Sequence, residues 1–119
     1  MIRLLLVDNN AGFLKAFARL LKRPPDMEVV AQAGSLAEAR GKLSGVDAAI
    51  IARGLPDGDG VELISELREA SPGAAVLVMS VTMERAHPQE ALEAGADEIL
   101  DKIATPEETI SAIRRVGGG

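Results

Sequence analysis

A few polar residues stand at the ends of short apolar runs in this sequence, and their types set the chemistry they could perform. Asp8 and Asn9 follow the first run, Ser80 ends the fourth and Lys102 ends the fifth. A carboxylate, a hydroxyl and an ammonium group could together bind a phosphoryl group if the fold gathered them. The third run, however, ends in Ala52, and a methyl group cannot accept a phosphoryl group.

The apolar runs that position these residues are typical of buried parallel strands. They are short, rich in β-branched side chains and without strict alternation, and they cover residues 2–7, 27–33, 46–52, 75–80 and 98–102. Segments with helical apolar spacing separate them, and Phe13 and Phe17 in the first segment are expected in the core. Five strands alternating with five helices predict an α/β three-layer sandwich, in which ligands bind at the carboxyl ends of the strands.

Local signals predict where several helices begin and end. The stretches 35–38 and 105–108 read as capping boxes, and Pro88 is a suitable first residue for the fourth helix. The last helix should end near Val116, because three glycines follow it. We therefore expect one domain over residues 1–116 and a glycine tail or linker over 117–119.

Composition limits the partners of this domain. The chain has 119 residues, no cysteine and a formal net charge of −5, and its 13 Lys and Arg are scattered along the sequence. A basic stripe that would bind phosphates is not evident, so we expect no direct nucleic-acid binding by this domain. The apolar amino terminus reaches Asp8 too soon to span a bilayer, and a cytoplasmic protein without membrane attachment is expected.

Several motifs occur together, in order, over essentially the whole chain. They are Leu-Val-Asp at 6–8, Leu-Pro-Asp-Gly-Asp-Gly at 55–60, Ser80, Ala-Gly-Ala-Asp at 94–97, and Lys102. In this combination the chain resembles the receiver domain of bacterial response regulators, the fold of the chemotaxis regulators, and most of all regulators that carry a C-terminal helix-turn-helix. The resemblance implies a flavodoxin-like parallel sheet with the strand order 2-1-3-4-5.

The resemblance also implies a phosphorylation site, and this sequence departs from it. In the family an aspartate at the position of Ala52 takes a phosphoryl group from a phosphohistidine or a small donor. Magnesium is held by that aspartate, by an acidic residue matching Asn9 and by a carbonyl matching Gly54. Residues matching Ser80 and Lys102 contact the phosphoryl oxygens.

The charges left in this pocket do not favour a divalent cation. A standard receiver pocket carries about −2, whereas Asp8 and Lys102 sum to about zero. We therefore expect no magnesium site and no cofactor. Ile99 also replaces the aromatic residue that usually reports phosphorylation, and Ile103 replaces the residue often found after the lysine.

These departures predict a phosphorylation-independent pseudo-receiver of a two-component-type signalling or transcription-regulatory protein. It would have no enzymatic activity and one fixed conformation. It would act through a protein partner or as a homodimer, using the family's usual output face of the fourth helix, fifth strand and fifth helix, here residues 87–116.

Other interpretations of the same residues stay open at this point. Asp8 and Lys102 could instead form a partly buried ion pair between the first and last strands, and the Ser80 hydroxyl could bond nearby backbone. The carboxylates of Asp57 and Asp59 could serve as substitute phosphoacceptors, but a role in the turn, with Asp59 capping the third helix, explains them better.

Three further alternatives concern the neighbourhood of this pocket. Arg53 could reach Asp8 across the pocket mouth or lie on the surface. His87 could be a phosphohistidine, although a solvated loop residue is the plainer interpretation. The vacant pocket could bind a small molecule, which would make the domain a ligand sensor.

Overall fold

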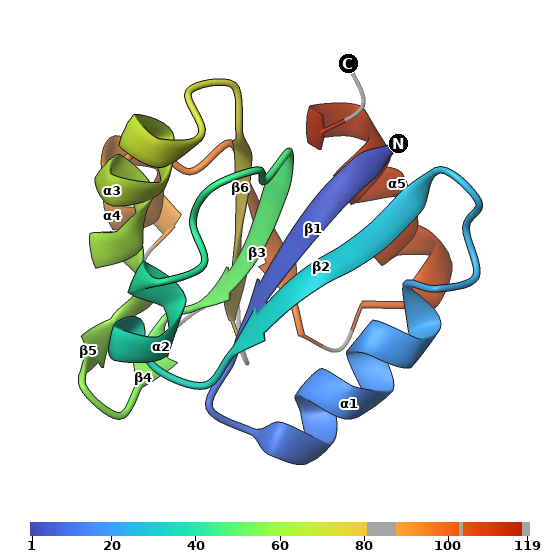
Figure 1. Cartoon of the computed structure of the whole chain (residues 1–119), viewed down its shortest axis with the longest axis horizontal. Coiled ribbons are helices and arrows are strands. Elements are labelled where there is room, and N and C mark those ends of the chain that lie inside the picture. Colours follow the sequence, from blue (N-terminus) through green and yellow to red (C-terminus); the bar gives the residue numbers. More distant parts are fainter. Residues whose placement is uncertain (81–87, 103, 118–119) are drawn as a thin grey trace.

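The predicted parallel sheet is present in the computed structural model, which describes residues 1–80, 88–102 and 104–117 (Figure 1). Its strands lie in the order β2-β1-β3-β6-β7, which is the order 2-1-3-4-5 expected from the sequence. Every neighbouring pair is parallel. The strands are β1 (Ile2–Val7), β2 (Met27–Ala33), β3 (Ala48–Ala52), β6 (Ala75–Ser80) and β7 (Glu98–Asp101).

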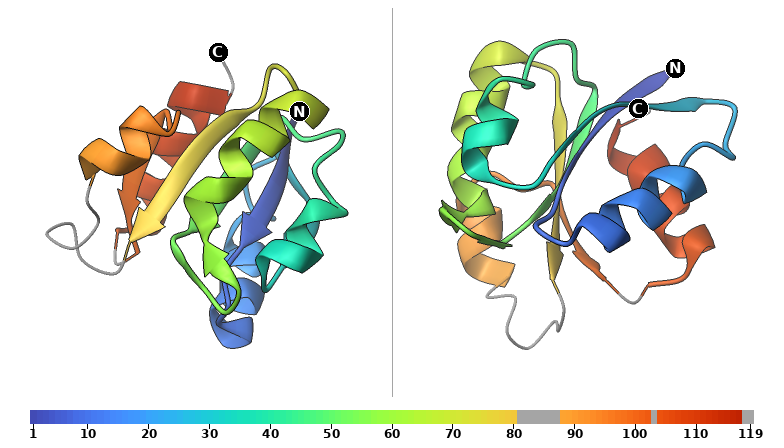
Figure 2. Two further views of the ribbon diagram at one scale, coloured as in Figure 1. Left: turned by 90° about the vertical axis from the view of Figure 1, so that its left-hand side faces the viewer. Right: turned by 60° about the horizontal axis from the view of Figure 1, so that its bottom comes forward.

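Five α-helices cover the two faces of the sheet, so the fold is the three-layer sandwich that the alternation predicted (Figures 1 and 2). The helices α1 (Ala11–Leu20) and α5 (Pro106–Gly117) pack on one face. The other face carries α2 (Leu36–Arg40), α3 (Leu63–Ala70) and α4 (Pro88–Glu93). None of the described helices is long and apolar enough to span a bilayer.

The core consists of one apolar cluster on each side of the sheet. Leu5 and Val7 of β1 join the cluster beneath α2 and α3, whereas Leu4 and Leu6 join the cluster beneath α1 and α5. All of β3 is buried, because helices cover both of its faces. This burial explains why the strands read as continuous apolar runs.

The helix starts agree with the local signals. The Ser35 hydroxyl accepts a hydrogen bond from the Glu38 amide at 3.1 Å, and the Thr105 hydroxyl accepts one from the Glu108 amide at 3.1 Å. The helix α4 begins at Pro88, as predicted. Both bonds of a capping box are present at Asp59, which caps the short 3₁₀ helix η1 (Gly60–Glu62) that leads into α3.

The predicted end of α5 was one residue short. The helix continues through Gly117. A β-carbon at this position would lie 3.0 Å from the Cβ of Ala48, so the helix approaches the start of β3 closely at its last residue.

The turn after β3 forms a small hairpin that the strand pattern did not predict. Its two strands are β4 (Gly54–Leu55) and β5 (Gly58–Asp59), paired antiparallel. The sequence indicated only a turn here, because two-residue strands carry no periodicity. The hairpin lies near the edge of the sheet where the parallel strands end (Figure 1).

Candidate functional site

The carboxyl ends of the parallel strands bring the predicted residues to one edge of the sheet. Asp8 follows β1, Ala52 ends β3, Ser80 ends β6 and Lys102 follows β7. The Lys102 amide donates a hydrogen bond to the Ser80 carbonyl at 2.8 Å, which extends the β6–β7 pairing to this residue. Asn9 lies beside them and is exposed.

Asp8 and Lys102 form the ion pair that the sequence left as an alternative. The Lys102 Nζ lies 2.7 Å from the Asp8 Oδ2, and the exposed fractions of the side chains are 21% and 1%. The other oxygen, Oδ1, accepts a hydrogen bond from the Asn10 amide at 2.8 Å. Oδ2 has no hydrogen bond of regular geometry within the described chain, so the ammonium charge is what compensates it.

An aromatic contact that sequence reasoning missed also holds Lys102. The ammonium group lies 4.2 Å from the centre of the Phe13 ring, and Phe13 meets Phe17 edge to face at 5.2 Å. Phe17 is buried as expected, whereas Phe13 is only half-buried. Lys102 follows β7, near the end of the chain, whereas Phe13 belongs to α1, near its beginning. Only the tertiary fold therefore shows that the Phe13 ring faces this lysine.

Ala52 is nearly buried, with 8% of its surface exposed. The Gly60 amide donates to the Arg53 carbonyl at 2.9 Å, and a β-carbon on Gly60 would lie only 2.0 Å from the Ala52 carbonyl oxygen. The chain entering η1 therefore packs directly against the backbone that ends β3. Gly54 is exposed, and a β-carbon there would meet nothing within 4 Å.

Arg53 does not pair with Asp8, which was one of the two positions considered for it. Its guanidinium lies 2.5 Å from Asp59 Oδ2 and 3.2 Å from Glu90 Oε1, so it links the β4–β5 hairpin to α4. Burial by itself raises the pKa of Asp59, but the hydrogen bonds from Arg53 and from the Val61 amide outweigh it, and the net pKa is lowered.

Asp57 caps α2, a role that the sequence did not indicate. Its Oδ1 accepts a hydrogen bond from the Leu36 amide at 2.8 Å and its Oδ2 accepts one from the Ala37 amide at 3.1 Å. These bonds hold the pKa of the exposed carboxyl below its ordinary value, and the bond from the Leu36 amide contributes most. The two segments lie about 20 residues apart in the chain, so no local pattern could have predicted the contact.

The residues at this edge do not fit a magnesium ion. Both oxygens of Asp8 are engaged, and Asn9 and Gly54 could offer only an amide oxygen and a backbone carbonyl. Within the described ranges, no three His, Cys, Asp or Glu side chains gather in a way that could hold a metal. Magnesium requires hard, anionic oxygen ligands in octahedral geometry, and this donor set lacks them.

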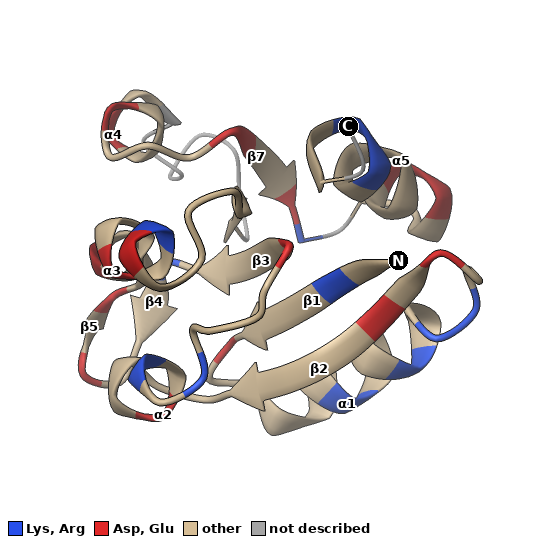
Figure 3. Ribbon diagram, turned by 45° about the horizontal axis from the view of Figure 1, so that its top comes forward, with Lys and Arg blue, Asp and Glu red and all other residues tan. Residues whose placement is uncertain are grey.

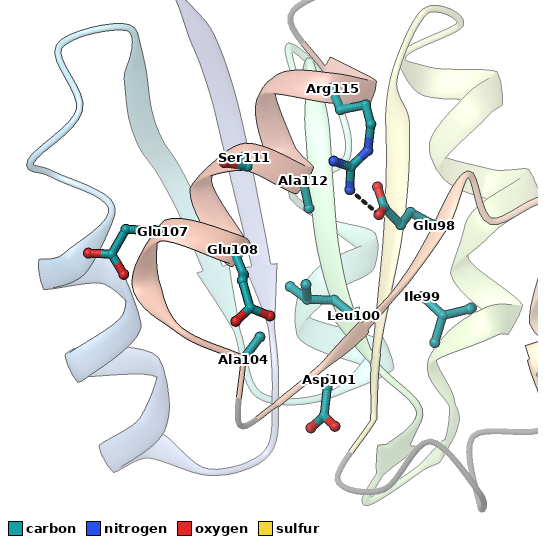
Figure 4. A pocket seen from close by; sticks show the side chains of 10 residues that line it. All are labelled: Glu98, Ile99, Leu100, Asp101, Ala104, Glu107, Glu108, Ser111, Ala112 and Arg115. Atoms are coloured by element: carbon teal, nitrogen blue, oxygen red, sulfur yellow. Dashed lines mark hydrogen bonds and ion pairs between the residues drawn. The ribbon is translucent and has the colours of Figure 1, made fainter.

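The predicted output face lies at one end of the sheet, where β7 is the edge strand. A groove of about 480 Å³ lies between β7 and α5. Figure 4 shows the side chains that line it, with Arg115 paired to Glu98. Ile99 is half-buried and packs against the cluster on the other side of the sheet. His87 and Ile103 lie outside the described residues.

The comparison with protein families identifies the fold just described. The model of the response regulator receiver domain matches residues 4–114. The chain belongs to the response regulator receiver domain family. The match begins at the third residue of β1 and includes all the later strands. The residues at the carboxyl edge of the sheet, from Asp8 to Lys102, lie within it.

Individual relatives are regulators of transcription. Over its whole length the chain is 39% identical to the transcriptional regulatory protein UhpA of Salmonella typhimurium and covers 60% of it. It is 31% identical, again over its whole length, to the DNA-binding transcriptional activator DevR/DosR of Mycobacterium tuberculosis and covers 56% of that protein. The chain thus spans a little over half the length of these relatives.

A solved receiver domain has the same architecture. The signal receiver domain of the response regulator NarL from Mycobacterium tuberculosis superimposes with a TM-score of 0.86 at 26% identity, covering 99% of this chain and 97% of that one. The chain is therefore similar to the receiver part of two-component response regulators in sequence and in structure.

Proposed function

We propose that this receiver domain is a phosphorylation-independent pseudo-receiver that acts through contacts with other proteins. The observation that carries the proposal is Ala52 at the carboxyl end of β3, where receiver domains present the phosphoacceptor aspartate. The carboxylate that remains nearby, Asp8, lies 2.7 Å from Lys102 and is neutralised by it. The edge of the sheet therefore offers neither an acceptor nor the negative charge that attracts a divalent cation.

The two other carboxylates of the turn are engaged in structural roles that support the proposal. Asp57 accepts two amide hydrogen bonds at the start of α2, and Asp59 caps η1 while it pairs with Arg53. A carboxylate that becomes phosphorylated would have to give up these bonds, and no cation site lies beside either of them in the described structure. Substitute phosphorylation at these residues is therefore disfavoured.

The output face would be built from α4, β7 and α5, and the partner would be another protein or a second copy. The proposal places this domain in a regulator with a DNA-binding effector half, because relatives named as transcriptional regulators extend beyond the part that this chain matches. Under this proposal the domain keeps one conformation, and its output depends on which partner is present and not on phosphorylation.

Intact mass spectrometry after incubation with acetyl phosphate and magnesium tests the proposal. We expect no mass increase of one phosphoryl group, while a standard receiver domain in the same tube gains one. A phosphorylated species of this chain would overturn the proposal, and peptide mapping to Asp8, Asp57 or Asp59 would identify the acceptor.

Variants that introduce the carboxylates of a standard receiver pocket test the same proposal by a gain of magnesium binding and phosphorylation. The variant Ala52→Asp should bind magnesium weakly, because its new carboxylate still shares the site with Lys102 and the neutral Asn9. The double variant Ala52→Asp/Asn9→Asp should bind magnesium more tightly and become phosphorylated. Full magnesium-dependent phosphorylation of the single variant would show that Asn9 does not limit the site.

A further inference from the structure

Cations without a partner are gathered in one short segment of the described structure. Most Lys and Arg side chains in the described residues hydrogen-bond or pair with an acidic group or a carbonyl. Those for which the described structure shows neither kind of contact are Lys15, Arg19, Lys22 and Arg23. The cations are scattered in sequence, but the unpaired ones lie together.

Three of these cations lie along one groove beside α1. Lys15 and Arg19 are one helical turn apart on α1, and Lys22 lies in the turn that follows the helix. All three line a groove of about 500 Å³ between α1 and β2, which also includes Leu14, Ala18 and Val29. The groove therefore combines an apolar floor with a cationic rim.

The groove lies at an edge of the molecule. The strand β2 is the edge strand of the sheet opposite β7, and Figure 3 shows the basic residues of α1 and the following turn beside it. Val30 of β2 is 43% exposed. The carboxylate that β2 itself carries, Glu28, is not among the groove residues.

Folding does not account for this arrangement. The apolar face of α1 that enters the core is formed by Leu14, Phe17 and Ala18. Like charges one helical turn apart repel each other and destabilise a helix, so Lys15 beside Arg19 opposes folding when nothing neutralises it. The rest of the chain is acidic, with a formal net charge of −5, yet none of its carboxylates in the described residues pairs with these three cations.

We infer that the groove between α1 and β2 docks an acidic, partly apolar segment of a partner protein. Carboxylates of the partner would pair with Lys15, Arg19 and Lys22, and its apolar side chains would cover Leu14 and Val29. A nucleic acid fits less well, because phosphates do not contact an apolar floor and the domain as a whole repels them.

The inference takes up the proposed role in protein contacts but uses a different face from α4, β7 and α5. Its failure would leave the result with acetyl phosphate unchanged, so the two can be told apart.

Calorimetric titration with a defined probe tests the inference. The probe is an amphipathic peptide of about 15 residues with Glu on one helical face and Leu on the other, and a matched peptide has Lys in place of Glu. We expect saturable binding of the acidic peptide and none of the basic one. Amide chemical-shift changes should fall on α1 and β2.

The variant Lys15→Gln/Arg19→Gln/Lys22→Gln should weaken binding of the acidic peptide at least tenfold. A control variant of equal net charge, Arg3→Gln/Arg40→Gln/Arg114→Gln, changes exposed cations elsewhere and should bind as the parent does; circular dichroism checks that both variants fold. Absence of saturable binding, or equal weakening in both variants, would refute the inference. Tighter binding of duplex DNA or of anionic phosphatidylserine vesicles through the same three residues would also refute it.

Discussion

At the scale of single residues, the pair of Asp8 and Lys102 is the buried ionic contact at the carboxyl edge of the sheet. The pair joins the end of β1 to the end of β7 and is covered by Phe13. Burying two charges stabilises little by itself, but removing one partner leaves the other uncompensated. The pair therefore ties the two ends of the sheet edge together.

Replacement of Lys102 by methionine should destabilise the domain, because Asp8 is almost fully buried and would lose the ammonium group. We expect a loss of about 3 kcal/mol in the free energy of unfolding, at the lower end for buried pairs since Lys102 keeps some solvent contact. Urea unfolding measures it. The double variant Asp8→Asn/Lys102→Met should recover part of the loss. As a control, Lys22→Met, at an exposed lysine whose side chain makes no hydrogen bond or ion pair within the described structure, should change stability by less than about 0.5 kcal/mol.

At the scale of elements, the segment that follows β3 ties several parts of the structure together. Asp57 caps α2, Asp59 caps η1, and Arg53 reaches α4 through Glu90. The charged side chains of this segment are therefore committed to contacts between elements.

The cap at Asp57 should make the stability of α2 depend on pH. The pKa of this carboxyl is lowered in the folded state, so its contribution is present above the ordinary carboxyl range and is lost as pH falls through the folded pKa. The Asp57→Asn variant should be less stable than the parent at pH 7, and the difference should shrink in acid, below about pH 4. Urea unfolding of both proteins from pH 7 to pH 3 measures it. A difference that stayed constant with pH would exclude an ionised cap.

Two glycines flanking the hairpin should respond differently to alanine. Gly60→Ala places a β-carbon against the Ala52 carbonyl, whereas Gly54→Ala points into open space. We expect Gly60→Ala to cost about 3 kcal/mol, the upper end for overpacking, because the clash is with backbone that cannot rotate away. Gly54→Ala should be close to neutral. Thermal unfolding measures the stability of the two variants. Equal losses of stability would contradict the close packing of Gly60 against the end of β3.

At the scale of the whole molecule, the two apolar clusters lie on opposite faces of one sheet, and every strand of that sheet, the edge strands included, contributes residues to both sides. Neither cluster can lose its strands without exposing the other, so the described structure should unfold as one unit. Any ligand that binds only the folded state must then raise the stability of the entire domain.

Magnesium with beryllofluoride, a mimic of the phosphorylated acceptor, should leave the unfolding midpoint of this protein unchanged. A ligand at 100 times its Kd adds about 2.7 kcal/mol to the folded state, an effect that a thermal melt detects easily. The Ala52→Asp/Asn9→Asp variant is the positive control and should gain stability under the same conditions. A stabilised parent protein would mean that the edge of the sheet binds these ions without the missing carboxylates.

The sequence alone determined the architecture and which residue stands at the end of the third strand. Short apolar runs alternating with amphipathic segments are local signals, and together with capping residues they predicted every strand of the main sheet and the starts of α2, α4 and α5. The identity of Ala52 is likewise visible without a structure. Strands and helix starts depend on residues close together in the chain, because the apolar period and the capping residues are local.

Only the tertiary structure decided which of the remaining side chains meet. Lys102 contacts Asp8 and Phe13, Asp57 caps a helix about 20 residues away, and Arg53 turns to Asp59 and Glu90. The groove between α1 and β2 exists because a helix packs beside an edge strand. Contacts of this kind follow from the order of strands and the packing of layers, and no local pattern encodes the distance between residues that the fold brings together.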